Sequence, residues 1–267
     1  ILCGRAFSNM FGSDVPKILL EDLAPALAEE EPEIIPLAPG QPMSIIFTSG
    51  TTSDPKGVML SEENFLSNIA MPASMQGLIT GRDRVLAMLP LHHVYPFTCT
   101  VLAPLYFGAA IIYPRSLKGE DIFAAVKNYG ATAFVAIPRV LELLCDRIFQ
   151  TAAAQPKIKQ ALFYGLLKIS DVLQPLGINP GKRLFSTIHR NFKGFRFFAS
   201  GGARLDADVH KKLRALGFKI IEAYGLTETS PIAAMNTLFE QVPGSVGRAA
   251  PGVELKIEKA DSHLDQG

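Results

Sequence analysis

The segment "IIFTSGTTSDPKGVML", residues 45–60, joins a short apolar run to a loop of hydroxyl residues, two glycines, a proline and a lysine. Glycine lets the backbone turn its N–H groups toward an anion, and the hydroxyls add further donors. Lys56 contributes one mobile positive charge. The loop over 48–57 is therefore expected to bind a polyphosphate, although a flexible Ser/Gly surface loop has the same composition.

This loop differs from the P-loop of the common nucleoside triphosphatases. That motif requires a glycine before the lysine and a hydroxyl residue after it. Here Pro55 precedes Lys56 and Gly57 follows it. A phosphotransferase built on the P-loop motif is therefore disfavoured.

Apolar runs that fit strands alternate along the chain with helical patterns. The expected strands are 44–47, 84–89, 109–113, 131–137, 195–199 and 218–223. The expected helices begin near Ser61, end near Phe107, and cover 120–130, 138–149 and 206–217. This alternation predicts an α/β fold with a predominantly parallel, doubly wound sheet flanked by helices.

The domain organisation follows from changes in composition. Residues 1–42 are an irregular acidic, proline-rich lead-in, 43–258 form the α/β core, and 259–267 are a short tail. A mostly helical, basic insertion is expected over about 151–192. Because the chain opens on Ile1 rather than Met, we expect an excised piece of a longer protein, and no signal-peptide pattern is visible in it.

Composition excludes several classes of protein. Among 267 residues the formal net charge is +1, which gives no electrostatic footprint for nucleic acid. The three cysteines lack metal-ligand spacing, and Cys99 and Cys145, which sit among apolar residues, fit buried, reduced thiols in a cytosolic setting. Residues 85–114 carry no Lys, Arg, Asp or Glu, but prolines and Gly108 interrupt them. Buried elements of a core fit that stretch better than a membrane span.

Three more unusual loops, 89–95, 200–204 and 224–231, also follow expected strands directly. In parallel sheets, ligands bind beyond the carboxyl ends of the strands. We therefore expect all four loops to gather on one edge of the sheet and to form one site.

The loop "AYGLTETSP", residues 223–231, offers three kinds of ligand contact. Tyr224 is able to stack on a base, Thr227 to bond a phosphate, and Glu228 to hold Mg²⁺. A buried tyrosine and a capping Thr-x-Thr turn explain the same residues without a ligand.

Glycines and histidines add to the expected site. Gly201 and Gly202 permit a flat ligand to lie against the backbone, and Asp206 is expected to cap the following helix. His92 and His93 are adjacent, which rules out the i, i+4 pair of a helical zinc site. A core or supporting role is the simpler reading of either histidine.

Together these motifs resemble the adenylate-forming acyl-CoA synthetases, the family that includes luciferases and the adenylation domains of peptide synthetases. "FTSGTTSDPKGV" resembles the phosphate-loop signature, "YGLTET" the second core motif and "ASGGARL" the adenine-side loop. "GSVGRAAPGVELKI" resembles the segment that follows, and order and spacing agree from residue 44 to about 257.

The resemblance implies a role for each matching residue. It implies Mg²⁺ contacts for Thr48 and Glu228, and an α-phosphate contact for Thr227. Tyr224 would stack on adenine, with Gly201, Gly202, Glu222 and Gly225 around it. His93 would guide the acyl carboxylate, while His92 stands where the family often has an aromatic residue. The residues implied to hold the β and γ phosphates are Ser49, Gly50, Thr51, Thr52 and Lys56. Lys56, Thr227, Glu228 and His93 would be the catalytic residues.

Ser53 and Ala223 depart from the family pattern, since both positions usually hold glycine. Within the family the long-chain fatty acid–CoA ligases are most similar, because "PRVLELLCDRI" and the helical insertion resemble theirs. The implied reaction uses ATP, Mg²⁺ and CoA to convert a fatty acid to acyl-AMP and then to acyl-CoA. The implied setting is cytoplasmic, and both peripheral membrane contact and a homo-oligomer are compatible with it.

Parts of the family pattern are not in this chain. The ribose-binding Thr-Gly-Asp motif, the small C-terminal domain with its catalytic lysine and the usual N-terminal part have no counterpart. We therefore expect this chain alone to bind ATP weakly and to turn over little. Another carboxylic acid as substrate, and a non-catalytic nucleotide- or lipid-binding fragment, remain alternatives.

Overall fold

A computed structural model describes residues 2–3, 18–19, 38–48, 55–75, 77–174 and 177–257. The chain divides into two compact units, Ile1–Ala38 and Pro39–Gly267. In the first unit, β1 (Leu2–Cys3) pairs in parallel with β2 (Ile18–Leu19). Most of the expected proline-rich lead-in therefore lies outside the described residues.

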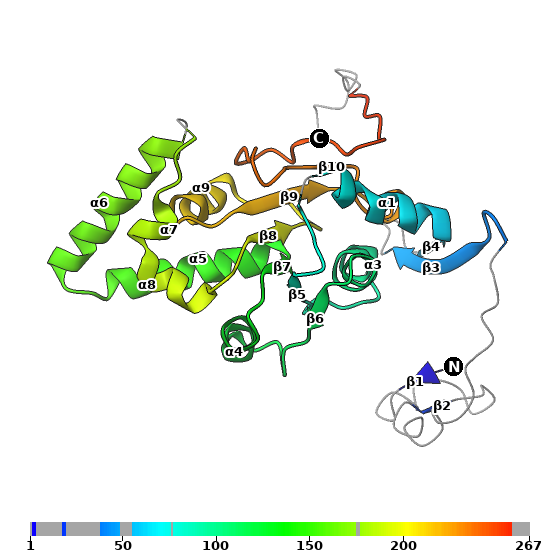
Figure 1. Cartoon of the computed structure of the whole chain (residues 1–267), viewed down its shortest axis with the longest axis horizontal. Coiled ribbons are helices and arrows are strands. Elements are labelled where there is room, and N and C mark those ends of the chain that lie inside the picture. Colours follow the sequence, from blue (N-terminus) through cyan, green and yellow to red (C-terminus); the bar gives the residue numbers. More distant parts are fainter. Residues whose placement is uncertain are drawn as a thin grey trace. The chain divides into compact units, whose positions relative to one another are not determined.

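The second unit is built on a seven-stranded sheet with the order β11-β10-β9-β8-β7-β5-β6 (Figure 1). The strands from β5 to β9 run parallel to their neighbours, and β10 and β11 pair antiparallel at one edge. The strands are β5 (Arg84–Leu86), β6 (Ala110–Ile112), β7 (Ala133–Ala136), β8 (Phe197–Ser200), β9 (Ile220–Tyr224), β10 (Ala234–Met235) and β11 (Arg248–Ala249). The predicted α/β class and the mainly parallel sheet are confirmed, although each strand is shorter than its apolar run.

Side chains of the central strands alternate between two apolar clusters. Phe134 and Phe198 pack with α4 (Gly119–Tyr129), α5 (Pro138–Ala153) and α9 (Ala207–Ala215). Their neighbours Val135, Phe197 and Ile221 belong to the second cluster, which includes Tyr95 and Cys99. Because successive residues of a strand face opposite sides, both faces of the sheet are covered.

The strand before the hydroxyl-rich loop is not part of this sheet. β3 (Pro42–Thr48) pairs antiparallel with β4 (Lys56–Ser61), and the two form a separate two-stranded sheet. The prediction that the loop over 48–57 follows a strand of the parallel sheet is therefore wrong. The loop connects the strands of a hairpin, because the apolar pattern resumes at Gly57 and pairs back on β3.

Capping explains where the helices begin and end. Ser61 caps α1 (Glu62–Ser74) and Asp206 caps α9, as predicted. Gly130 ends α4 with a φ of 65°, a left-handed conformation that glycine adopts without strain. The remaining helical segments are α2 (Val94–Pro96), the π-helix η3 (Phe97–Leu102), α3 (Ala103–Tyr106), α6 (Lys157–Leu173), α7 (Gly181–Leu184), α8 (Ser186–His189), and the 3₁₀ turns η5 (Arg190–Phe192) and η6 (Thr227–Thr229).

The uncharged stretch over 85–114 folds into β5, the α2–η3–α3 segment and β6. Within the described ranges, no helix is both long enough and apolar enough to cross a membrane. Burial raises the pKa of the Cys99 thiol to about 12 and that of Cys145 to about 11. Both cysteines are free thiols, and both remain protonated at neutral pH.

Candidate active site

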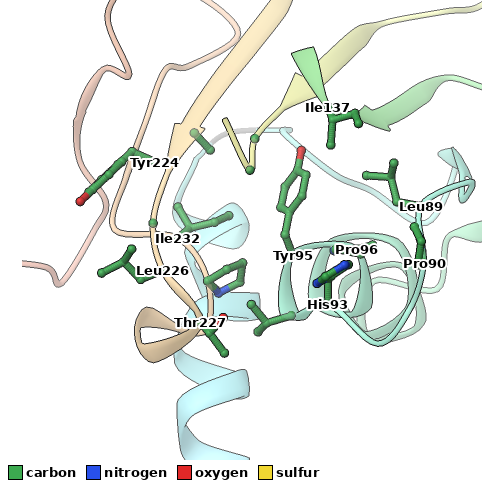
Figure 2. Close-up of a pocket in the computed structure, with 16 residues that line it drawn as sticks. Leu89, Pro90, His93, Tyr95, Pro96, Ile137, Tyr224, Leu226, Thr227 and Ile232 are labelled. Atoms are coloured by element: carbon green, nitrogen blue, oxygen red, sulfur yellow. The ribbon is translucent and has the colours of Figure 1, made fainter. Parts of the chain in front are cut away.

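A cavity of about 480 Å³ opens at the carboxyl ends of the parallel strands (Figure 2). Its lining comes from three of the four loops that the sequence singled out, together with Ile137 at the end of β7. The residues on it are Leu89, Pro90, His93, Val94, Tyr95, Pro96, Ile137, Gly201, Gly202, Ala223, Tyr224, Gly225, Leu226, Thr227, Pro231 and Ile232. This volume is in the range of small-molecule sites, and the mostly apolar lining with a few polar groups is typical of them.

Tyr95 anchors one wall of the cavity. Its hydroxyl donates to the carbonyl oxygen of Ala199 at 3.1 Å and lies 3.4 Å from that of Ala136. The ring fills the space beside Gly201, where a Cβ would lie only 2.9 to 3.2 Å from its carbons. Burial raises the pKa of Tyr95 well above its usual value, with a smaller contribution from Cys99, so the hydroxyl remains a donor.

The missing side chain of Gly201 therefore serves the packing of Tyr95. Gly202 differs, because only the Cγ2 atom of Ile137 lies near its Cβ position, at 3.8 Å. Its φ of 81° is a left-handed conformation that favours glycine. At the loop after β8, Gly202 is thus the glycine that leaves room beside the backbone.

The loop after β9 is held by its own hydrogen bonds. The Oγ1 atom of Thr229 accepts from the N–H of Leu226 at 2.9 Å and donates to the carbonyl oxygen of Pro231 at 2.6 Å. A Cβ at Gly225 would lie 1.5 Å from that same carbonyl oxygen, so only glycine fits this turn. Thr229 fixes the turn, and Thr227 is left to line the cavity.

Tyr224, half exposed at 49%, is one of the lining residues at the β9 side of the cavity, and Figure 2 shows its ring turned away from Tyr95 and His93. Its position at the last residue of β9 leaves the ring accessible from solvent. The alternative reading of Tyr224 as a buried residue is wrong. An exposed aromatic ring at the rim of a cavity is suited to stacking on a flat ligand.

The base of the hydroxyl-rich loop lies beside the turn that carries Thr227 and Glu228. Strand β4 contacts η6, and Thr48 faces Lys56 at the end of the hairpin, where its hydroxyl donates to the Lys56 carbonyl oxygen at 3.4 Å. Asn68 of α1 ties the two regions together. Its amide donates to the Thr229 carbonyl oxygen at 2.7 Å and accepts from the N–H of Ile232 at 3.0 Å.

Several predicted site residues are not on the cavity wall. Lys56 and Glu228 are exposed, and Thr48 is half-buried at the hairpin end. Ser49, Gly50, Thr51, Thr52 and Ser53 lie outside the described residues. Among the residues that the structure describes, no group of three or more His, Cys, Asp or Glu side chains is placed to hold a metal.

Glu222 is a correction to the expected site. It is buried and does not line the cavity; its Oε1 atom lies 2.5 Å from Nδ1 of His210 on α9. The physical reason is strand alternation, because Ile221 and Ala223 pack in the cluster that includes Tyr95, whereas Glu222 between them faces α9 and its His210. Nothing in the sequence singled out His210, although its spacing from Leu213 places it on the buried face of α9.

Comparison with known proteins adds to this geometry. The model of the family described as AMP-binding enzyme matches residues 9–266. The peroxisomal long chain acyl-CoA synthetase 7 of Arabidopsis thaliana is 29% identical over 242 residues, covering 86% of this chain and 34% of that protein. Sulfoacetate–CoA ligase of Cupriavidus necator is 28% identical over 246 residues, covering 89% of this chain and 40% of that protein.

A solved structure shares the fold. The O-succinylbenzoate coenzyme A synthetase of Bacillus subtilis, in complex with ATP and a magnesium ion, superposes with a TM-score of 0.69 at 21% identity. That alignment covers 97% of this chain and 46% of the synthetase. The chain spans between about a third and two fifths of the length of the two curated relatives.

Proposed function

This chain belongs to the AMP-binding enzyme family, and from that premise we propose that it carries the nucleotide-binding part of an acid–CoA ligase. The observation that carries the proposal is the cavity at the carboxyl edge of the sheet, which Gly202, Tyr224, Thr227 and His93 all line. In the proposed reaction, a carboxylate oxygen attacks the α-phosphorus of ATP and pyrophosphate leaves. The thiol sulfur of CoA then attacks the acyl carbon, and AMP leaves.

The residues of the cavity suit the parts of an adenylate. Tyr224 stacks on the adenine ring, and the backbone at Gly202 and Gly225 lies against the nucleotide. Thr227 donates its hydroxyl to an α-phosphate oxygen. His93, on the opposite wall, orients the carboxylate toward the phosphorus. We assign Glu222 no contact with adenine, because it is paired with His210 away from the cavity.

The hairpin supplies the contacts to the leaving pyrophosphate. Lys56, with Ser49, Gly50, Thr51 and Thr52, is proposed to bind the β and γ phosphates. Thr48 and Glu228 offer oxygen ligands of the kind that Mg²⁺ prefers, and β4 contacts the turn that carries Glu228. Bound Mg²⁺ would neutralise charge on the phosphates as pyrophosphate departs.

We propose a long-chain fatty acid as the acyl substrate. The support is the apolar lining around His93, which includes Leu89, Val94 and Ile137, and the similarity to a long chain acyl-CoA synthetase. Sequence identity alone does not select this substrate, because a sulfoacetate ligase is nearly as similar. Small polar acids are therefore the necessary comparison.

The test is carboxylate-dependent ATP–pyrophosphate exchange, measured on this chain and on the product of its complete reading frame. Fatty acids of increasing length are compared with sulfoacetate and malonate. We expect exchange by the complete product, highest with long fatty acids, and little from this chain alone. Glu228→Gln should lower the exchange rate on the order of a hundredfold, because it removes a negative metal ligand.

Glu120→Gln, an exposed substitution on α4, is the matched control and should leave the rate unchanged. Exchange with sulfoacetate but not with fatty acids would replace the long-chain substrate and keep the reaction. Nucleotide binding without exchange, unaffected by Glu228→Gln, would instead identify a binding module.

A further inference from the structure

We propose that the outer face of helix α6 (Lys157–Leu173) docks on the surface of a membrane that contains anionic lipids. This inference does not depend on the proposed function. It starts from an exposed apolar stripe of Ile158, Leu162, Ile169 and Val172, whose exposed fractions are 85%, 60%, 53% and 64%. With Gly165, these residues recur at alternating spacings of four and three, which places them along one side of a helix.

The opposite side of α6 is fixed to the rest of the unit. Phe163 packs edge-on against Phe149 and Phe185, with ring centroids 5.5 and 5.4 Å apart. Near the start of the helix, Gln160 donates to the Ala153 carbonyl oxygen at 2.7 Å, and just beyond its end Gln174 donates to that of Arg214 at 3.2 Å. Because both ends and the middle are anchored, the helix cannot roll its apolar stripe inward.

Figure 1 shows α6 at one margin of the helical layer, with α5, α7 and α9 on its inner side. At 1.5 Å per residue, the stripe from Ile158 to Val172 extends about 21 Å. An apolar face of that length, on a helix whose other face is buried in the protein, matches a helix lying in the plane of a lipid interface.

Charge decides between a bilayer and other occupants of this stripe. Residues 151–193 contain seven basic residues and one acidic residue, a net charge of +6 in a chain whose total is +1. The basic residues, all exposed, are Lys157, Lys159, Lys168, Lys182, Arg183, Arg190 and Lys193. On α6 itself Lys157, Lys159 and Lys168 outnumber Asp171, so a second copy would bring like charges together, whereas anionic headgroups attract each lysine.

Two of the lysines are placed beside the stripe itself. Lys157 precedes Ile158, and Lys168 precedes Ile169, so each lies about 100° around the helix from a stripe residue. They are eleven residues apart, three turns of helix, and therefore lie on one line. That line borders the stripe on the side away from the packed Phe163. From there the long lysine side chains reach the lipid headgroups while the apolar stripe enters the boundary of the acyl chains.

The chain contains no tryptophan, which gives the test a clean signal. Leu162→Trp places a single fluorophore on the stripe. We expect its emission to shift to shorter wavelength with phosphatidylcholine vesicles that contain about 30% phosphatidylglycerol, and not with phosphatidylcholine alone. Leu117→Trp replaces a residue exposed to a similar extent, 64%, and should not shift. If the emission of Phe47→Trp shifts and that of Leu162→Trp does not, the hairpin and not α6 is the docking face, and the proposal is overturned.

Vesicle flotation of the chain without an added tryptophan measures how strongly it binds to the vesicles. Leu162→Glu combined with Ile169→Glu should weaken it more than tenfold, and Lys157→Gln and Lys168→Gln by roughly fivefold each. Leu117→Glu should have no effect, and circular dichroism verifies that each variant is folded. Equal flotation of wild type and the double glutamate variant would overturn the proposal. A dimer in solution that this variant converts to monomer would assign the stripe to a second copy instead.

Discussion

The two ends of the parallel sheet are built in opposite ways. At the amino ends, the buried carboxylate of Asp83 joins three segments: it pairs with Arg196 and accepts from Thr132 at 2.7 Å and from the Thr80 N–H at 2.8 Å. These partners precede β8 and β7 or lie in the turn before β5. At the carboxyl ends, the side chain that contacts both β7 and β8, in addition to their ladder of backbone hydrogen bonds, is Tyr95, through its neutral hydroxyl.

The difference shows how one sheet provides both stability and a site. Polar groups at the amino end are satisfied by one another, so that end is closed. The carboxyl end is walled by glycines, aromatic rings and short turns, and its polar groups Thr227 and His93 face a cavity. The predictions below test whether stability is concentrated at the first end and ligand geometry at the second.

The largest effect is expected from Asp83→Ala. Removing the carboxylate leaves the Arg196 guanidinium, which is partly buried, without its charged partner and breaks several hydrogen bonds. We expect a loss of about 3 kcal/mol in the free energy of unfolding, measured by urea denaturation. Asp208→Ala removes an exposed carboxylate and should cost no more than about 0.5 kcal/mol. Equal losses for the two variants would contradict a closed amino end.

Gly225→Ala should have the next largest effect. The new Cβ would collide with the Pro231 carbonyl oxygen, so the loop that carries Thr227 must open. We expect a loss of about 2 kcal/mol in unfolding free energy and weakened binding of AMP, measured by calorimetry. The control is Gly165→Ala in α6, where nothing lies within 4 Å of the Cβ position. That change should stabilise the chain by about 0.5 to 1 kcal/mol.

Tyr95→Phe is expected to have a smaller effect. It keeps the ring against Gly201 but removes the hydrogen bond to Ala199, which should cost about 1 kcal/mol in unfolding free energy. Tyr106→Phe, at a tyrosine that is 58% exposed, should be neutral. If Tyr95→Phe is also neutral in urea denaturation, the hydroxyl adds no stability to the carboxyl end of the sheet.

Acid should have the smallest of the four effects, because a protonated carboxyl still accepts hydrogen bonds. Burial acts to raise the pKa of Asp83, but hydrogen bonds from Arg196, Thr132 and Thr80 outweigh it and hold that pKa below its usual 3.8. The stabilisation is therefore fully present above pH 3.8 and is lost as pH falls through the lowered pKa. Asp83→Asn should remove this part of the acid dependence in urea denaturation at several pH values. An unchanged acid profile would assign the dependence to other carboxylates.

The sequence by itself determined the class of fold, its helix caps and most of the cavity. Alternating apolar runs identified the parallel strands, since burial on both faces requires them. Ser61, Gly130 and Asp206 fixed helix ends through local hydrogen bonds and backbone conformation, which depend on nearby residues only. The loops after β5, β8 and β9 met at one edge, because parallel topology brings the carboxyl ends of strands together.

Only the tertiary structure decided which partner each residue meets across long sequence distances. It paired β3 with β4 rather than with the sheet, filled the space at Gly201 with Tyr95, and turned Glu222 toward His210. It also joined Asp83 to Arg196, more than a hundred residues away, and left the stripe on α6 exposed. Local pattern specifies the type of an element and its buried face, whereas partners depend on how all elements pack together.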